Sequence, residues 1–202
     1  MAESLDSTTA DMGNDGVQQC RNLLKAQGIK VVAFDMDQTA VSIHSRGRLR
    51  RGDPLENFLN KATEDFKKLV PFLHRDGFGL SIATHSDEAE FGILVKPETH
   101  ILGSELARAL ISKYFPSEIV DSFFLVAYNP RARPDGHKEE NKIKRYHIRK
   151  LIEHFQVEPH EILFLDDTKK VVEDLNKTCG VKAFLVDEKK GFELSDILDN
   201  LS

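Results

Sequence analysis

Two aspartates and a threonine follow an early apolar run in this sequence. The segment KVVAFDMDQT at positions 30–39 places Asp35 and Asp37 two residues apart, with Thr39 after them. A short apolar, β-branched run bounded by polar residues is typical of a strand buried on both faces of a parallel sheet. Open α/β sheets bind ligands at the carboxyl ends of such strands, so both carboxylates are candidates for chemistry.

Two later apolar runs end in the same way. The run at 78–83 is followed by Thr84 and His85, and the run at 161–165 is followed by Asp166 and Asp167. In a doubly wound sheet these strand ends lie along one edge, so the polar side chains should gather there. One carboxylate pair at about 4 Å repels by about 4 kcal/mol at an effective dielectric of about 20, so the group requires a compensating positive charge.

A hard divalent cation supplies that charge. Mg²⁺ takes one or two carboxylates, keeps several waters and leaves positions for substrate phosphate oxygens. A lysine would contribute as well, and the helix expected from about residue 141 to 155 offers Lys142 and Lys144 near its start. Spacing alone does not separate these two lysines.

Alternating helical and strand patterns surround these residues. Each of these apolar runs is expected to form a strand, as are residues 122–128 and 181–186, with helices between them. The helix from 55 to 75 should be interrupted near Pro71, because proline removes a helix hydrogen bond, and Ser195 should cap the last helix. Strands that alternate with helices at this spacing predict right-handed βαβ units and a parallel sheet. The other expected helices are 17–25, ending before Gly28, 103–114 and 168–179.

Composition limits the class of protein. With 202 residues, 40% of them hydrophobic, the chain suffices for one domain with a sizeable core. Residues 1–16 lack hydrophobic periodicity and predict a flexible tail, which leaves 17–202 as the domain. A net charge of −5 gives no general attraction to nucleic acid or anionic membrane.

The same sequence features indicate a compartment. Cys20 and Cys179 have no metal-binding spacing and are expected to be free thiols in a reducing environment. The start has no secretory pattern, and no segment approaches the roughly 20 apolar residues of a membrane helix. We therefore expect a soluble, cytoplasmic protein, with the nucleus as the alternative, and no membrane partner.

The ordered strand ends resemble the motifs of the haloacid dehalogenase (HAD) superfamily of aspartate-nucleophile phosphohydrolases. Residues 31–39 match its DxDxT motif, Thr84 its second motif, Lys144 its lysine, and Asp166 and Asp167 its acidic pair. The stretch from Lys144 to the acidic pair is similar to the capless eukaryotic magnesium-dependent phosphatases. The resemblance implies a three-layer, doubly wound, Rossmann-like α/β fold with five core strands in the order 5-4-1-2-3, helices on both faces and no separate cap domain.

The resemblance also implies roles for these residues. Asp35 would attack phosphorus and form an aspartyl phosphate, while Asp37 would protonate the leaving oxygen and then activate water. The second aspartate favours phosphoryl transfer over carbon–halogen cleavage, which has no leaving oxygen to protonate. The metal group would be Asp35, Asp37 through its carbonyl, and Asp166 or Asp167, around Mg²⁺.

Substrate binding would involve strand-end residues and two loops. The predicted contacts are with Thr39, Thr84, His85 and Lys144, and with Arg46 and Arg48 of an arginine-rich flap, residues 40–54. Both the flap and the loop after Tyr128 are too short for a folded cap, so we expect an open site suited to bulky phosphorylated substrates such as protein side chains. The flap also carries His44, Arg50 and Arg51, and the second loop Arg131, Arg133 and His137. Arginine suits anionic groups, but a solvated loop is the alternative.

The resulting functional expectation is a Mg²⁺-dependent phosphomonoester hydrolase in a single HAD-like domain. A catalytically silent phosphate-dependent binding module and a phosphotransferase are the alternatives. One departure from the family concerns Val171, which stands where many members carry Asn or Asp near the metal. The physiological substrate and the oligomeric state are not indicated by the sequence.

Overall fold

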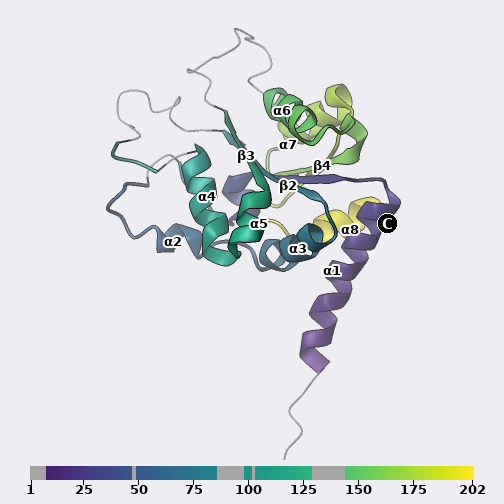
Figure 1. Ribbon diagram of the computed structural model, residues 1–202, viewed down its shortest axis with the longest axis horizontal. Helices are drawn as coiled ribbons and strands as arrows, with labels where there is room; N and C mark the ends of the chain where they lie inside the picture. The colour runs from purple at the N-terminus through teal and green to yellow at the C-terminus, as the bar shows by residue number, and fades with distance from the viewer. Residues whose placement is uncertain (1–7, 47–48, 86–97, 102, 129–143) are drawn as a thin grey trace, which may run out of the picture.

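A parallel sheet forms the centre of the molecule in this computed structural model, which describes residues 8–46, 49–85, 98–101, 103–128 and 144–202 (Figure 1). The described residues form a five-stranded sheet with the order β3-β2-β1-β4-β5, the same as the predicted 5-4-1-2-3 counted from the other side. All four strand pairings are parallel. The strands are β1 (Val31–Phe34), β2 (Gly79–His85), β3 (Phe123–Tyr128), β4 (Ile162–Asp166) and β5 (Lys182–Leu185).

Helices cover both faces of the sheet, which gives the predicted three layers (Figure 1). Side chains alternate along β1, so Val32 and Phe34 join the core under one helical layer while Val31 and Ala33 join the other. The larger layer holds α1 (Thr8–Ala26), α3 (Glu64–Arg75), α4 (Gly103–Tyr114), α5 (Ser117–Ser122) and α8 (Ser195–Leu201), with the short α2 (Glu56–Leu59) against α4. The other layer holds α6 (Arg145–Phe155) and α7 (Lys169–Asp174), which continues into a π-helical turn, η5 (Leu175–Cys179); a short 3₁₀ helix, η4 (Pro159–Glu161), precedes β4.

Strand β1 lies in the middle of the sheet and aligns the site. Phe34 is in register with Ile82 of β2 and with Leu165 of β4. Beyond Phe34, the backbone N–H of Asp35 still donates to the carbonyl of Leu165 at 2.8 Å. The carboxyl ends of these three strands, with Asp35, Thr84 and Asp166, therefore lie at one edge of the sheet, as predicted.

Several predicted helix boundaries are wrong. Helix α1 begins at Thr8 rather than Val17, so residues 8–16 are helical where a flexible tail was expected. The segment 55–75 is interrupted between Leu59 and Glu64, and Pro71 lies inside α3. The break falls there because the Thr63 side chain accepts a hydrogen bond from the N–H of Phe66 and so caps α3.

Two further helix starts differ from the prediction. Helix α6 begins at Arg145, since Lys144 has a left-handed backbone (φ 55°). Ser195 is the first residue of α8 and Leu194 holds the cap position. Helix α5 was not predicted.

None of the helices in the described part of the chain is both long enough and apolar enough to cross a membrane.

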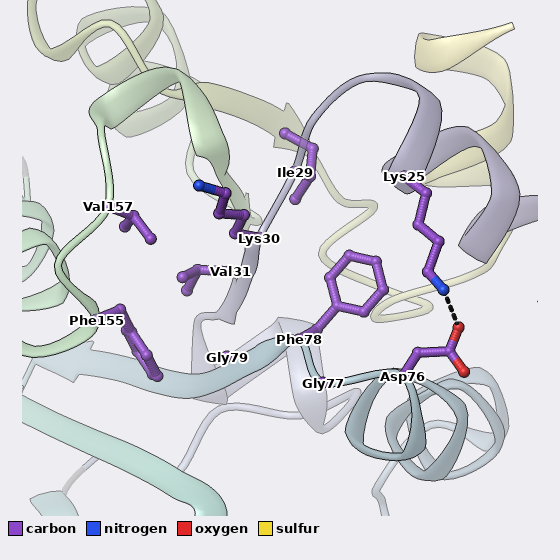
Figure 2. A pocket seen from close by; sticks show the side chains of 10 residues that line it. All are labelled: Lys25, Ile29, Lys30, Val31, Asp76, Gly77, Phe78, Gly79, Phe155 and Val157. Atoms are coloured by element: carbon purple, nitrogen blue, oxygen red, sulfur yellow. Dashed lines mark ion pairs between the residues drawn. The ribbon is translucent and has the colours of Figure 1, made fainter.

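A pocket of about 320 Å³ lies at the amino-terminal edge of the sheet, opposite the predicted site (Figure 2). Phe78 and Phe155 form apolar parts of its wall, and two lysines contribute to its rim. Lys25 pairs with Asp76, which also pairs with Arg21 and Arg75, and Lys30 pairs with Glu161. Both ammonium groups of the pocket are therefore engaged in ion pairs within the protein.

Candidate active site

A tight turn after β1 presents the two aspartates. Asp35 and Asp37 both have extended backbones, and Gln38 between Asp37 and Thr39 is left-handed (φ 57°). A left-handed backbone is uncommon for a residue other than glycine and often marks a functional site. The buried side chains of Met36 and Ala40 anchor this turn, η1 (Met36–Ala40), in the core.

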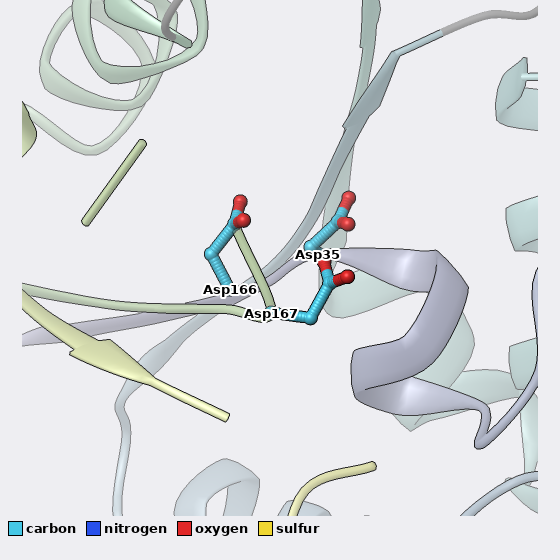
Figure 3. Close-up of side chains that lie close together, drawn as sticks. All are labelled: Asp35, Asp166 and Asp167. Carbon is cyan, nitrogen blue, oxygen red and sulfur yellow. The ribbon is translucent and has the colours of Figure 1, made fainter. Parts of the chain in front are cut away.

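Three carboxylates converge at the carboxyl ends of β1 and β4 (Figure 3). Asp35, Asp166 and Asp167 each offer an oxygen, and these oxygens lie within 4.8 Å of one another. Lys144, only 3% exposed, inserts its ammonium group between two of them, with Nζ 2.5 Å from Asp35 Oδ1 and 2.9 Å from Asp166 Oδ2. The structure thus brings the predicted acids together and places Lys144 among them.

Burial and neighbouring charges shift the pKa values in this cluster. Burial raises the pKa of Asp35 to about 7, with the positive charge of Lys144 opposing the increase and the negative charge of Asp166 adding to it. Burial works to lower the pKa of Lys144, but the charges of Asp166 and Asp35 outweigh it, and the net shift is upward. Burial, with Asp166, also raises the pKa of Asp167. The lysine is therefore charged. Its single positive charge does not balance the three carboxylates of the cluster in the protein alone.

The carboxylates fit a divalent cation. Asp166 is fully buried; its Oδ1 accepts the N–H of Thr168 at 2.8 Å. Its Oδ2 has the ion pair with Lys144 but no hydrogen bond from the described residues. Buried acceptors without a hydrogen bond call for an explanation, and oxygen ligands are those that Mg²⁺ prefers. Asp35, Asp166 and Asp167 are thus a chemically suitable donor set. The side chain of Val171, by contrast, packs in the core.

The end of β2 is fixed to the start of α6. Lys144 Nζ donates to the carbonyl of Ala83 at 3.0 Å, and His147 Nε2 lies 2.8 Å from the carbonyl of Thr84. The rings of His147 and His85 meet edge to face at 5.1 Å. Packing of α6 therefore sets the position of Thr84, whose hydroxyl donates to the carbonyl of His85.

Two flap residues contact Asp37. Ser45 donates to Asp37 Oδ2 from its backbone N–H at 2.9 Å and from its hydroxyl at 2.6 Å. His44 Nδ1 lies 2.6 Å from the same oxygen. Ser45 was not predicted as a site residue, because a loop serine eight positions after an aspartate carries no periodic or motif signal.

The other predicted contact residues are less central. Thr39 is fully buried, so its contact with substrate stays a prediction. Arg46 is exposed, with a left-handed backbone (φ 54°). Arg51 forms a two-pronged ion pair with Glu105 of α4, at 2.7 and 2.6 Å, and so supports the flap. Arg48, Lys142 and the predicted contact residues in 129–143 lie outside the described residues.

In the described residues, the flap pairs with other segments of the chain and does not form a hairpin. Val41 pairs with Ala62, and Arg50 pairs with His100, in isolated antiparallel bridges. Backbone bonds from Arg51 to Thr99 and from Ile101 to Leu49 extend the second contact. One end of the flap is therefore fixed to Ala62, next to the turn that carries Asp37, and the other end is fixed to residues 99–101.

Comparisons with known proteins support the fold only. Neither protein-family models nor curated protein sequences give a match to the chain. Among solved structures, an uncharacterized protein from Listeria monocytogenes serotype 4b is similar with a TM-score of 0.50 and 15% identity, covering 82% of this chain and 83% of that one. The HAD domain of effector protein Lem4 from Legionella pneumophila has a TM-score of 0.49 and 12% identity, covering 86% and 93%. At 15% identity the similarity to the Listeria protein concerns the fold alone.

Proposed function

We propose that this chain is a Mg²⁺-dependent phosphomonoester hydrolase of the HAD type, which acts through an aspartyl phosphate on Asp35. The main support is the buried arrangement in which Lys144 Nζ lies between Asp35 and Asp166 while Asp167 completes a three-carboxylate group. A structural ion-pair network would not require the third acid. Clusters of perturbed acids at the carboxyl edge of a parallel sheet are typical of catalytic sites.

Asp35, Asp166 and Asp167, with the backbone carbonyl of Asp37, would hold the Mg²⁺. When bound, this ion would supply the positive charge that lets an anionic nucleophile approach an anionic phosphate. It would also favour the ionised form of Asp35, whose pKa burial raises to about 7 in the protein alone.

The chain's own groups can carry the remaining steps. An Asp35 carboxylate oxygen bonds to phosphorus, and the phosphorus–oxygen ester bond breaks as Asp37 gives its proton to the departing oxygen. Asp37 then takes a proton from the water that attacks the aspartyl phosphate, which releases phosphate and restores Asp35. Lys144 and Thr84 would bind the phosphate oxygens, and the His147 contact to Thr84 would keep that end of β2 in place.

We further propose a bulky phosphorylated substrate, such as a phosphoprotein side chain. The described residues include no folded cap, and the flap, whose Ser45 contacts Asp37, carries the exposed Arg46 and Arg50. A phosphotransferase would use the same first step and pass the phosphoryl group to an acceptor other than water. Release of inorganic phosphate distinguishes these two reactions, and a silent binding module would release none.

The test is a hydrolysis screen over p-nitrophenyl phosphate and phosphopeptides, with and without Mg²⁺. We expect Mg²⁺-dependent phosphate release by the wild type and loss of nearly all of it in Asp35→Asn. Asp199→Asn, which changes an exposed acid on α8, is the matched control and should retain activity. Full activity in Asp35→Asn, or no turnover of any phosphoester by the wild type, would refute the proposal.

A further inference from the structure

The flap contacts one oxygen of Asp37 and leaves the other alone. The backbone N–H and the hydroxyl of Ser45 both reach Oδ2, and Ser45 itself is only 8% exposed. Asp37 Oδ1 is also buried, yet it has no hydrogen-bond partner among the residues that the structure describes. The two oxygens of this carboxyl group are therefore not equivalent.

This asymmetry identifies the oxygen that can carry a proton. A carboxylate oxygen that already accepts two hydrogen bonds is a poor site for a third hydrogen, whereas Oδ1 has its lone pairs free. A buried polar atom without a partner among the described residues calls for an explanation, and a catalytic role is one. Oδ1 is therefore the oxygen of Asp37 that the flap leaves available.

The contact of His44 with Asp37 depends on the tautomer of the imidazole ring, whereas the contact of Ser45 does not. Its Nδ1 lies 2.6 Å from Asp37 Oδ2 and also 3.0 Å from the backbone N–H of Arg46. One ring nitrogen cannot donate to the first and accept from the second, so the tautomer decides which contact is a hydrogen bond. The backbone N–H of Ser45 can only donate, and its contact has no such ambiguity.

We propose that Ser45 is a positioning residue for general acid catalysis, which holds Asp37 through Oδ2 so that Oδ1 gives the proton to the leaving oxygen. The inference rests on the proposed hydrolase function and adds a specific task for the flap. Ser45 touches neither the phosphate nor the reacting atoms in this scheme; it acts through Asp37. Removal of the Ser45 hydroxyl should therefore lower the rate only for substrates whose leaving oxygen needs a proton.

Two substrates separate this task from a general structural one. An alkyl phosphate such as β-glycerophosphate needs protonation of its leaving oxygen, whereas p-nitrophenyl phosphate releases a stable anion. In Ser45→Ala the hydroxyl contact is lost, and a hydrogen bond to a charged group corresponds to about 10- to 100-fold in rate. We expect kcat/KM to fall by about that factor for β-glycerophosphate and by less than about threefold for p-nitrophenyl phosphate.

The ratio of the two kcat/KM values is the readout, because it does not depend on the fraction of enzyme that is folded. Ser45→Thr retains a hydroxyl and should restore the ratio toward that of the wild type. Ser42→Ala removes a half-buried flap serine whose hydroxyl, among the described residues, contacts the carbonyl of Lys61 at 3.4 Å, and should leave the ratio unchanged.

The outcomes distinguish the two levels of the proposal. An active wild type with an unchanged ratio in Ser45→Ala, or without recovery in Ser45→Thr, overturns the positioning role and leaves the hydrolase proposal standing. A wild type that hydrolyses neither substrate in Mg²⁺ overturns the hydrolase proposal, and the role of Ser45 with it.

Discussion

Protonation of one buried histidine should contribute to the acid sensitivity of the fold. His147 is fully buried, and the groups that face it are His85, Lys144 and the ring of Tyr146. Burial, followed by the nearby His85 and Lys144, lowers its pKa well below the ordinary value of 6.5. His147 therefore stays neutral in the folded protein at pH values at which it is protonated in the unfolded chain. Its own contribution to stability must decrease as the pH falls below about 6.5.

The size of this effect follows from linkage. Each pH unit below the unfolded pKa costs about 1.4 kcal/mol for as long as folded His147 stays neutral. Between pH 7 and pH 5 the free energy of unfolding should therefore fall by about 2 kcal/mol on account of this histidine. Asp35 acts in the opposite direction, because its raised pKa favours the protonated folded state over the same interval.

The perturbation that isolates His147 is substitution by glutamine. In His147→Gln the amide can still donate to the Thr84 carbonyl, but no group titrates. Urea unfolding at pH 7 and pH 5 should show that the loss of stability on acidification is about 2 kcal/mol smaller in the variant than in the wild type. Contributions from Asp35 are present in both proteins and cancel in this difference.

His160→Gln provides the matched control, because this histidine is exposed in the short helix η4. Its wild-type-like response to acid would show that any effect comes from burial. If His147→Gln loses as much stability between pH 7 and pH 5 as the wild type does, the linkage reasoning is refuted.

Metal binding and flap charge give two further predictions. Mg²⁺ at about 100 times its Kd should stabilise the protein by about 2.7 kcal/mol and raise Tm by about 5–10 °C in a thermal-shift assay. Asp166→Asn should abolish most of that increase and Asp199→Asn none of it; equal increases in both variants would disprove the predicted site. Arg46→Ala combined with Arg50→Ala should raise KM several-fold for an acidic phosphopeptide and leave KM for p-nitrophenyl phosphate nearly unchanged, whereas equal changes would show that these arginines do not bind the extended substrate.

Local sequence patterns were sufficient for the sheet. Apolar runs that end in Asp35, Thr84 and Asp166 predicted three parallel strands with their carboxyl ends at one edge, and the pairings of β1 with β2 and β4 confirm it. The misplaced helix break had a local signal as well. Thr63 followed by two acids is a helix start, and it was overlooked in favour of Pro71.

Other features depend on contacts between distant parts of the chain. Asn176 illustrates this: its side chain bonds both the N–H and the carbonyl of Ala183, which occupies the exposed edge of β5. Nothing in the neighbouring sequence distinguishes this asparagine, because an asparagine that satisfies the edge of a strand looks the same in sequence as an asparagine in an ordinary turn. Ser45 was missed for the same reason.

The sequence by itself determined which acids stand at strand ends, since strand and helix periods are local and the edge of a parallel sheet follows from them. Only the tertiary structure decided which side chains contact each acid. The packing of α6 on β2 buries Lys144 between Asp35 and Asp166, and the anchoring of the flap brings Ser45 to Asp37. These contacts join residues far apart in the chain, and it is burial in a shared low-dielectric interior that makes the charges depend on one another.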